Sequence, residues 1–407
     1  MDQGLSRGLH ILMISDVYFP RINGVSTSIL TFRSELSTLG HKVTVVAPDY
    51  PTPTQVEPDI RRVASRRVPF DPEDRLMSRR ALQAALRALA SDDIDLIHVQ
   101  TPFLAHYAGV ALARQLRIPC IETYHTYFEE YLFHYVPFMP RAWMRAAARG
   151  FSRRQCNALD AVVVPSRAMR EVLLGYGVRV PMHVIPTGLE LGHWQGGDGA
   201  AFRERHAIAC NRPVLVHVGR VAFEKNIDFL LRMLVRVRER VPDVLLVVSG
   251  DGPARGDLEA LSRRLGLWDS VLFVGYLDRR TTLLDCYRAG DAFVFASNTE
   301  TQGLVLLEAM ALGVPVISTA VLGTRDILEA AQGALVAHEN ERDFAEKVVR
   351  VLQDRALRVR LSHAAREDAA CWSAPATAQR MAALYTSLAG IPAPRPGAPP
   401  GRGERFR

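Results

Sequence analysis

The sequence predicts an α/β protein made of two Rossmann-like domains whose parallel sheets face each other across a cleft. At 407 residues the chain is too long for one ordinary hydrophobic core, so two domains are expected. Apolar runs of strand length alternate with segments of helical period, which indicates repeated βα units and parallel sheets. The glycine-rich stretch "GLELGHWQGGDGAAF" divides these units into two series and predicts a linker near residues 188–201.

The predicted strands form one series on each side of this linker. The strands of the first series are His10–Ser15, Lys42–Ala47, Leu96–Val99, Cys120–Thr123, Ala161–Val164 and His183–Ile185. Those of the second are Pro213–Val218, Val244–Ser249, Val271–Val274, Ala292–Ala296 and Val314–Ser318. We therefore expect a first domain over residues 1–190, a second over 191–365 and a final helix over 366–388. The tail, residues 389–407, is rich in proline, glycine and arginine and is expected to be disordered.

Composition and charge exclude several classes of protein. No apolar run approaches the roughly 18 residues that span a bilayer, and the amino terminus has the pattern of a first strand rather than of a signal peptide. The five cysteines are scattered and free of CxxC spacing, which favours reduced thiols in the cytoplasm over disulfides or a zinc site. The net charge is +7, yet no nucleic-acid-binding signature is present, so a nucleic-acid partner is not expected.

The stretch "SDVYFPRINGVSTS" (15–28), which includes Asp16, follows the first strand and precedes a helix expected to begin near Thr27. Gly24 is expected in the βα turn, at the strand edge where open α/β sheets bind ligands. A glycine there allows backbone N–H groups to approach a phosphate, helped by the helix N-terminus. The alternative is an ordinary turn glycine, and the dinucleotide fingerprint GxGxxG is absent.

The stretch "HVGRVAFEKNID" (217–228) has the same layout at the start of the second domain. Gly219 ends a strand, and Arg220 and Lys225 lie in the loop before a helix. Two cations at this place suit a diphosphate, whose negative charge grows as it departs, although loop cations are more often merely solvated. Gly250 in "VSGDGP" is a further candidate for the ligand site, and a simple turn explains it as well.

The stretch "SNTETQGLVLLEAMALGVPVIS" (297–318) carries two glutamates eight positions apart. Glu300 is expected in a loop, and Glu308 inside the helix that Gly303 opens. Residues 302–304, namely Gln302, Gly303 and Leu304, would offer free N–H groups to an anion. Two carboxylates at this spacing could hold the hydroxyls of a sugar and of a ribose at opposite ends of a nucleotide sugar. The alternative is a glutamate stabilised by the helix dipole plus an exposed helix glutamate.

Together these motifs resemble the donor site of family-4 retaining glycosyltransferases, which have the two-domain GT-B fold. "NGV" after the first strand and "YHT" at 124–126 fit the same family, and the resemblance covers about residues 9–388. It implies a nucleotide diphosphate sugar held mainly by the second domain. Arg220 and Lys225 would hold the diphosphate, Glu300 the transferred sugar and Glu308 the ribose, with backbone at Gly24, Gln302 and Gly303 assisting.

The resemblance also implies that His125 lies next to the reacting sugar. It further implies transfer with retention by front-face attack, which requires no protein nucleophile. "DID" at 93–95 matches the DxD pattern of metal-dependent transferases, but it precedes a strand at the wrong end of the sheet. We therefore expect no metal and no cofactor beyond the nucleotide sugar as co-substrate.

A basic amphipathic helix is predicted to start near Pro140. Its arginines at every fourth position form a stripe: Arg141, Arg145, Arg149 and Arg153. Its apolar residues are expected on the opposite side: Trp143, Met144, Ala147, Ala148 and Phe151. Such a helix can lie on an anionic membrane, at about 1 kcal/mol per basic residue. The alternative is an ordinary surface helix packed on its own sheet, and "RRVASRRVPF" (61–70) could extend the basic surface.

"HTYFEEYLFHYVP" (125–137) resembles the bacterial transferases that glucosylate diacylglycerol. The acceptor candidates are Asp16, Tyr127, Phe128, Glu129, Glu130 and His134. The resulting expectation is a cytoplasmic, peripherally membrane-bound transferase that moves glucose from UDP-glucose to a diacylglycerol-type lipid. One alternative is a mannosyl- or other hexosyltransferase acting on another lipid or glycan. Another is a GT-B-fold sugar-nucleotide epimerase or a non-catalytic nucleotide-sugar binder.

Overall fold

The computed structural model describes residues 7–51, 57–68, 71–127 and 141–390. Seven parallel strands form the first sheet: β1 (His10–Ile14), β2 (Lys42–Pro48), β3 (Ile60–Val63), β6 (Leu96–Val99), β7 (Cys120–Thr123), β8 (Ala161–Val164) and β9 (Met182–Val184). Their order across the sheet is β3-β2-β1-β6-β7-β8-β9. A separate antiparallel pair consists of β4 (Ser65–Val68) and β5 (Asp71–Met77).

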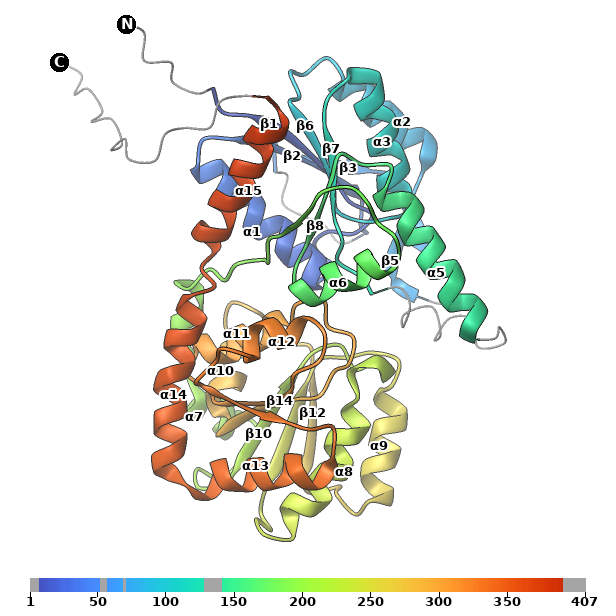
Figure 1. Cartoon of the computed structure of the whole chain (residues 1–407). Coiled ribbons are helices and arrows are strands. Elements are labelled where there is room, and N and C mark those ends of the chain that lie inside the picture. Colours follow the sequence, from blue (N-terminus) through green and yellow to red (C-terminus); the bar gives the residue numbers. More distant parts are fainter. Residues whose placement is uncertain (1–6, 52–56, 69–70, 128–140, 391–407) are drawn as a thin grey trace, which may run out of the picture.

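The second sheet has six parallel strands: β10 (Val214–Val218), β11 (Leu245–Ser249), β12 (Val271–Gly275), β13 (Ala292–Phe295), β14 (Val316–Thr319) and β15 (Ala334–Ala337). Their order is β12-β11-β10-β13-β14-β15. The predicted α/β fold with two parallel-sheet domains is confirmed, and Figure 1 shows the domains stacked one above the other. All eleven predicted strands are present, with ends that differ by at most two residues.

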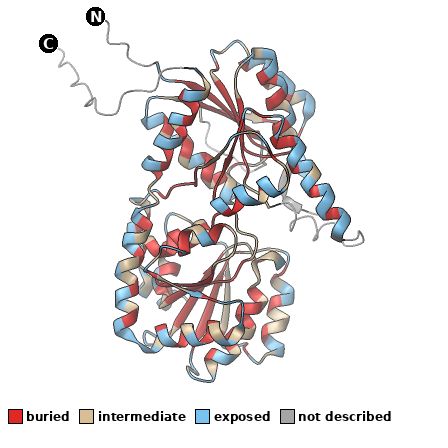
Figure 2. Ribbon diagram, viewed as in Figure 1, coloured by how far each residue is buried: buried red, intermediate tan, exposed pale blue. Residues whose placement is uncertain are grey.

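Helices cover both sheets. Those of the first domain are α1 (Gly24–Thr38), α2 (Arg79–Leu89), α3 (Leu104–Leu116), α5 (Arg141–Cys156) and α6 (Arg167–Gly175). Those of the second are α7 (Gly199–Arg205), α8 (Ile227–Arg238), α9 (Arg255–Arg264), α10 (Thr282–Ala289), α11 (Leu304–Ala311), α12 (Gly323–Leu328), α13 (Glu341–Gln353) and α14 (Arg355–Ala370). Figure 2 shows buried residues on the strands and on the inward helix faces, as expected for sheets covered on both sides.

The chain crosses between the domains twice, at adjacent places. The backbone N–H of Leu189 donates to Trp372 O (2.7 Å), and the N–H of Ala374 donates to Leu189 O (2.9 Å). Gly188 is required here, because a Cβ on it would lie 2.4 Å from Ala374 Cα. The expected single helix over 366–388 is therefore wrong: α14 ends at Ala370, and α15 (Ala374–Leu388) begins after the crossing.

Helix α15 returns to the first domain and packs on α1 (Figure 1). A buried hydrogen-bond chain anchors it to the sheet. The hydroxyl of Tyr385 lies 2.6 Å from His98 Nδ1, and His98 Nε2 lies 2.7 Å from Thr123 Oγ1. Burial lowers the pKa of His98 to about 3, so this imidazole is neutral at physiological pH and acts only as a hydrogen-bond partner.

Two helices differ from their predicted form. Helix α1 begins at Gly24 rather than near Thr27, because the Asn23 side chain accepts a hydrogen bond from the N–H of Ser26 and caps the helix. In α5 the predicted apolar side is only half right. Met144 and Ala148 are buried, but 74% of Trp143 is exposed and Phe151 is exposed too.

Candidate active site

The predicted ligand-binding residues come from the carboxyl ends of both sheets, which face each other where the domains meet (Figure 1). Hydrogen bonds cross this junction. Thr301 Oγ1 donates to the backbone oxygen of His125 at 3.0 Å, and the Gln302 amide contacts the backbone of Thr187. Loops at the carboxyl ends of parallel strands form the ligand sites of open α/β sheets, so the two domains share one candidate site.

Lys225 and Glu300 form an ion pair at the second-domain side of the junction. Lys225 ends a short 3-10 helix (Phe223–Lys225) after β10. The next residue, Asn226, has a left-handed backbone (φ 55°), and its amide donates to Ala296 O at 3.2 Å. This turn directs the lysine toward the loop that follows β13, where Glu300 lies. The structure thus pairs Lys225, which was predicted to hold the diphosphate, with Glu300, which was predicted to hold the transferred sugar.

The loops after β10 and β11 hold three further predicted residues of this half, Gly219, Arg220 and Gly250. Arg220 directly follows Gly219 and is partly buried. Gly250 has φ +125°, and a Cβ on it would lie 1.9 Å from Gly219 O. Gly250 therefore allows the close contact between the two loops. A Cβ on Gly219, by contrast, would have His217 Nε2 as its nearest contact, at 3.7 Å.

The N-terminus of α11 lies beside Glu300, as expected. Gly303 adopts the left-handed conformation (φ +99°), and Leu304 begins the helix. The Gln302 side chain is buried: its Oε1 accepts from Thr187 N (2.9 Å), and its Nε2 donates to Thr187 O (2.7 Å). The sequence pattern indicated only the backbone of Gln302 and not this side-chain contact, because Thr187 is 115 residues away.

Glu308 is buried, so the alternative of an exposed helix glutamate is wrong. Its side chain is only 2% exposed and is ion-paired with Arg279, and the hydroxyl of Tyr287 donates to it at 2.9 Å. The Arg279 guanidinium also lies over the ring of Trp194, 5.4 Å from its centroid. Arg279, Tyr287 and Trp194 were not predicted from the sequence. The feature of the sequence that pointed to this contact was the arginine pair Arg279–Arg280 after the third strand of the second domain.

On the first-domain side, His125 follows β7, and its Nε2 lies 3.1 Å from Gln100 Oε1 at the end of β6. Burial lowers the pKa of His125 to about 4, so the imidazole is neutral at pH 7. Because the two strands are neighbours in the sheet, Gln100 and His125 meet at its carboxyl edge. Sequence analysis missed Gln100, which lies 25 positions earlier in the chain.

Asp16 follows β1, next to β6 in the same sheet. It accepts hydrogen bonds from Thr101 Oγ1 (2.8 Å) and from the N–H of Ala105 (3.2 Å) at the start of α3. Burial raises the pKa of Asp16 to about 6, against the opposing effect of these bonds. Asp16 thus caps α3 while lying on the same sheet edge as His125.

Gly24 is the first residue of α1 rather than a turn residue, which corrects the predicted position. A Cβ on it would meet no atom within 4 Å, so the space beside Gly24 is open. The unpaired N–H groups of such a terminus attract anions. The ligand role of Gly24 stays a prediction, now at the first residue of α1.

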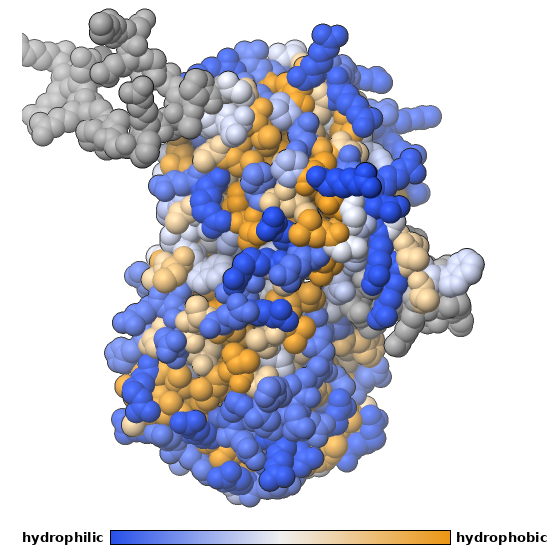
Figure 3. All heavy atoms as spheres, in the orientation of Figure 1, coloured by the Kyte–Doolittle hydropathy of each residue, from blue (hydrophilic) through white to orange (hydrophobic). Residues whose placement is uncertain are grey.

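The predicted acceptor and membrane residues are only partly described. Glu129, with Phe128, Glu130 and His134, lies outside the described residues, as does the side chain of Arg141, while Tyr127 is partly exposed. Arg145, Arg149 and Arg153 are exposed on α5, and the guanidinium of Arg149 lies over the Tyr176 ring at 5.6 Å. Figure 3 shows hydrophilic side chains along the edge of the first domain that α5 forms.

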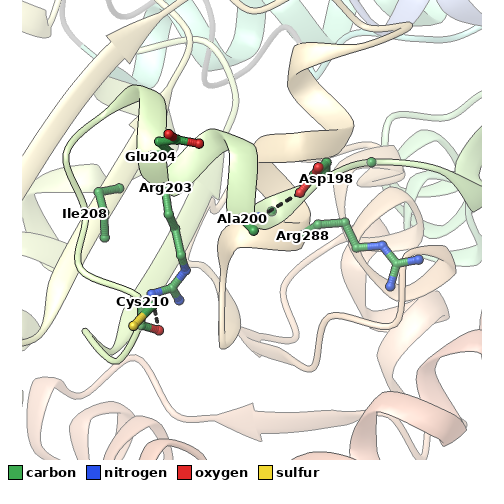
Figure 4. A pocket seen from close by; sticks show the side chains of 9 residues that line it. Asp198, Ala200, Arg203, Glu204, Ile208, Cys210 and Arg288 are labelled. Atoms are coloured by element: carbon green, nitrogen blue, oxygen red, sulfur yellow. Dashed lines mark hydrogen bonds between the residues drawn. The ribbon is translucent and has the colours of Figure 1, made fainter.

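One cavity of the second domain lies away from the junction (Figure 4). Its volume is about 720 Å³, and α7, α10 and the neighbouring loops line it. Arg203 in its wall donates hydrogen bonds to the carbonyls of Ala209, Arg212 and Ala289, so this arginine is occupied in holding loops together. The cavity contains none of the residues predicted to bind the donor.

The "DID" stretch lies at the opposite edge of the first sheet. Asp95 Oδ2 accepts the backbone N–H of His10 at the start of β1 (2.8 Å). In the part of the chain that the structure describes, no three His, Cys, Asp or Glu side chains gather into a possible metal site. Within the same residues, no helix combines the length and the apolar character needed to cross a bilayer.

Two family models match the chain, one on each domain. Residues 22–193 match the model "Glycosyltransferase Family 4", and residues 198–368 match "Glycosyl transferases group 1". Together they cover the residues that carry both halves of the candidate site.

Several relatives are similar over most of their length. The chain is 35% identical to the alpha-monoglucosyldiacylglycerol synthase of Streptococcus pneumoniae, over 76% of this chain and 71% of the relative. It is 27% identical to a GDP-mannose-dependent alpha-mannosyltransferase of Mycobacterium tuberculosis, over 94% and 98%. Among solved structures, the complex of Anabaena HepE with UDP-glucose superposes with a TM-score of 0.76 at 18% identity, covering 93% of this chain and all of HepE.

Proposed function

Because the chain belongs to the family-4 glycosyltransferases with the GT-B fold and is a hexosyltransferase, we propose that its donor is UDP-glucose and its acceptor a diacylglycerol-type membrane lipid. The observation that carries the donor half is the Lys225–Glu300 pair; the residue after Glu300, Thr301, contacts the backbone of His125 across the domain junction. The acceptor half draws its support from the pneumococcal relative, whose name gives a diacylglycerol glycolipid.

In the proposed reaction, the acceptor hydroxyl oxygen attacks the anomeric carbon from the face that the diphosphate leaves. The bond from that carbon to the diphosphate oxygen breaks, and the hydroxyl proton passes to the departing phosphate. Arg220 and Lys225, with the N-termini of α1 and α11, would stabilise the growing negative charge. No metal is needed in this scheme, because the two cations and the helix ends supply the positive potential.

Glu300 would accept hydrogen bonds from hydroxyls of the transferred sugar, and Glu308 from those of the ribose. Without a ligand, both carboxylates are paired with cations: Glu300 with Lys225 and Glu308 with Arg279. Hydroxyl groups of the bound donor would therefore displace these cations or share the carboxylates with them. His125, neutral at pH 7, would act near the reacting sugar as a hydrogen-bonding group rather than as a charge.

The first test is transfer of labelled hexose into the organic phase, with diacylglycerol-loaded anionic vesicles and separate UDP- and GDP-sugars. We expect label from UDP-glucose, and Glu300→Ala or Lys225→Ala should each abolish it. Wild-type turnover in either variant would remove the assigned site. Label from GDP-mannose alone would favour the second candidate, a mannosyltransferase, which the mycobacterial relative supports through its coverage of nearly the whole chain.

We also propose that α5 holds the enzyme on anionic membrane. Its exposed arginines and the exposed Trp143 present both the charge and the aromatic contact that interfacial helices use. The double variant Arg145→Glu/Arg153→Glu should weaken binding to anionic vesicles in a salt-sensitive manner. A control with the same change in charge, Arg263→Glu/Arg264→Glu on the exposed part of α9, should bind like wild type.

Tryptophan provides a second comparison for the same surface. Trp143 on α5 and Trp268 in the second domain are each 74% exposed. Trp143→Ala should lower vesicle affinity, and Trp268→Ala should leave it unchanged. If the two α5 variants, Arg145→Glu/Arg153→Glu and Trp143→Ala, both bind vesicles like wild type, α5 is an ordinary surface helix.

A further inference from the structure

Three consecutive side chains, Glu300, Thr301 and Gln302, contact three different parts of the molecule. Glu300 pairs with Lys225 of its own domain. The Thr301 hydroxyl donates to the backbone oxygen of His125 in the other domain (3.0 Å). The Gln302 amide makes two hydrogen bonds to the backbone of the crossing segment at Thr187. One short loop therefore contacts the donor half, the acceptor half and the connection between them.

The backbone of this loop is fixed by its own domain. The N–H of Gly323, at the start of α12, donates to Glu300 O at 2.9 Å. A Cβ on Gly323 would lie 2.0 Å from Thr301 O, so α12 packs against the loop more closely than any other residue would allow. The backbone of Thr301 therefore cannot move far without moving that of Glu300.

His125 is held on the other side of the same contact. Its imidazole lies against Gln100 on the neighbouring strand, and its carbonyl accepts the Thr301 hydroxyl. The preceding residue, Tyr124, is tied to the sheet through its N–H, which donates to Val163 O at 2.9 Å. Within the described chain, His125 thus has one hydrogen-bond partner in each domain: Gln100 in the first and Thr301 in the second. Thr301 is the residue that directly follows Glu300.

We propose that Thr301 is a positioning residue that sets His125 relative to Glu300 when the domains close, an inference that rests on the proposed function. Transfer joins an anomeric carbon held by one domain to a hydroxyl held by the other, so the two halves must align closely. A misplacement of about 1 Å in such a site can cost about 100-fold in rate. Donor binding itself draws mainly on groups of the second domain and does not need this contact.

The test compares Thr301→Val, which removes the hydroxyl and keeps the shape, with Thr301→Ser, which keeps the hydroxyl. We expect Thr301→Val to lower kcat by about 10- to 100-fold. Its donor KM and its affinity for UDP should stay within about threefold of wild type, since ground-state binding is unchanged. Thr301→Ser should recover most of the rate.

Arg167→Ala is the matched control. It removes a side-chain contact between the two domains but keeps the hydrogen bond from Thr301 to His125. The exposed guanidinium of Arg167 on α6 pairs with Asp326 (3.4 Å) and Glu329 (2.9 Å) of the second domain, and such pairs at the surface contribute little. The backbone N–H of Arg167, which donates to Asp326, is kept in the variant. We expect nearly wild-type kcat. If Arg167→Ala slows transfer as much as Thr301→Val does, or if Thr301→Val retains wild-type kcat, Thr301 has no positioning role. A loss of UDP affinity equal to the loss of rate would make Thr301 a donor-binding residue instead.

Hydrogen exchange gives a readout that does not depend on turnover. With UDP bound, the backbone amides of residues 120–127 should be protected in wild type and in Thr301→Ser, and less protected in Thr301→Val. Equal protection in all three would overturn the inference. If wild type transfers no hexose while the difference in protection persists, the contact stands and the proposed reaction is wrong.

Discussion

Replacing Arg279 by methionine removes the guanidinium that covers Glu308 and keeps an unbranched apolar side chain over Trp194. Breaking a fully buried ion pair by removing one partner costs about 3–5 kcal/mol, because a charge is left buried without compensation. Here the Arg279 side chain is 25% exposed, and the hydrogen bond from Tyr287 to Glu308 remains. We therefore expect a loss of about 2–3 kcal/mol in the free energy of unfolding, below the range for a fully buried pair.

For a domain of this size, such a loss lowers the thermal midpoint by about 5–10 °C. Urea unfolding followed by tryptophan fluorescence suits the measurement, because Trp194 lies against the altered site. Arg280→Met is the matched control. Arg280 is the exposed neighbour, and its replacement should change the free energy of unfolding by no more than about 0.5 kcal/mol.

A double-mutant cycle separates the ion pair from packing. Glu308→Gln removes the buried charge, so Arg279→Met/Glu308→Gln should be more stable than the sum of the single losses by about 1–3 kcal/mol. Strict additivity, or an Arg279→Met variant as stable as Arg280→Met, would refute the claim that Arg279 compensates a buried carboxylate. Glu308→Gln should in addition weaken UDP binding, which calorimetry would detect.

Three further outcomes are expected. Tyr385→Phe leaves His98 Nδ1 buried without its partner, and should cost about 1–3 kcal/mol and speed proteolysis at α15; unchanged cleavage would contradict the anchoring role. Because burial raises the pKa of Asp16 from 3.8 to about 6, the folded state holds a proton that the unfolded chain has lost, and stability falls as pH rises from about 4 to about 6. Asp16→Asn should flatten that slope in urea unfolding, and an identical slope would exclude Asp16 as its source. Gly188→Ala places a Cβ 2.4 Å from Ala374 Cα, and should lower both the thermal midpoint and the transfer rate; a wild-type midpoint would show that the crossing tolerates a side chain.

The buried strands were predictable because parallel strands covered on both faces are continuous apolar runs. Strands β3, β4, β5 and β15 were not predicted. The first three lie in an arginine- and proline-containing stretch without such a run, and β15 is a short strand at a sheet edge. The start of α1 depended on the Asn23 cap. The exposed faces of α5 depended on which side packs against the sheet, which periodicity alone does not specify.

The sequence by itself determined the two parallel-sheet domains, the loops after β1, β10 and β13, and the residue types that suit a nucleotide sugar, because these depend on local pattern. Only the tertiary structure decided which side chains meet. Arg279 reaches Glu308 across 29 positions, Thr301 reaches His125 across 176, and Tyr385 reaches His98 across 287. Such pairings follow from strand order and domain closure, which bring distant residues within hydrogen-bonding distance and leave no periodic trace in the chain.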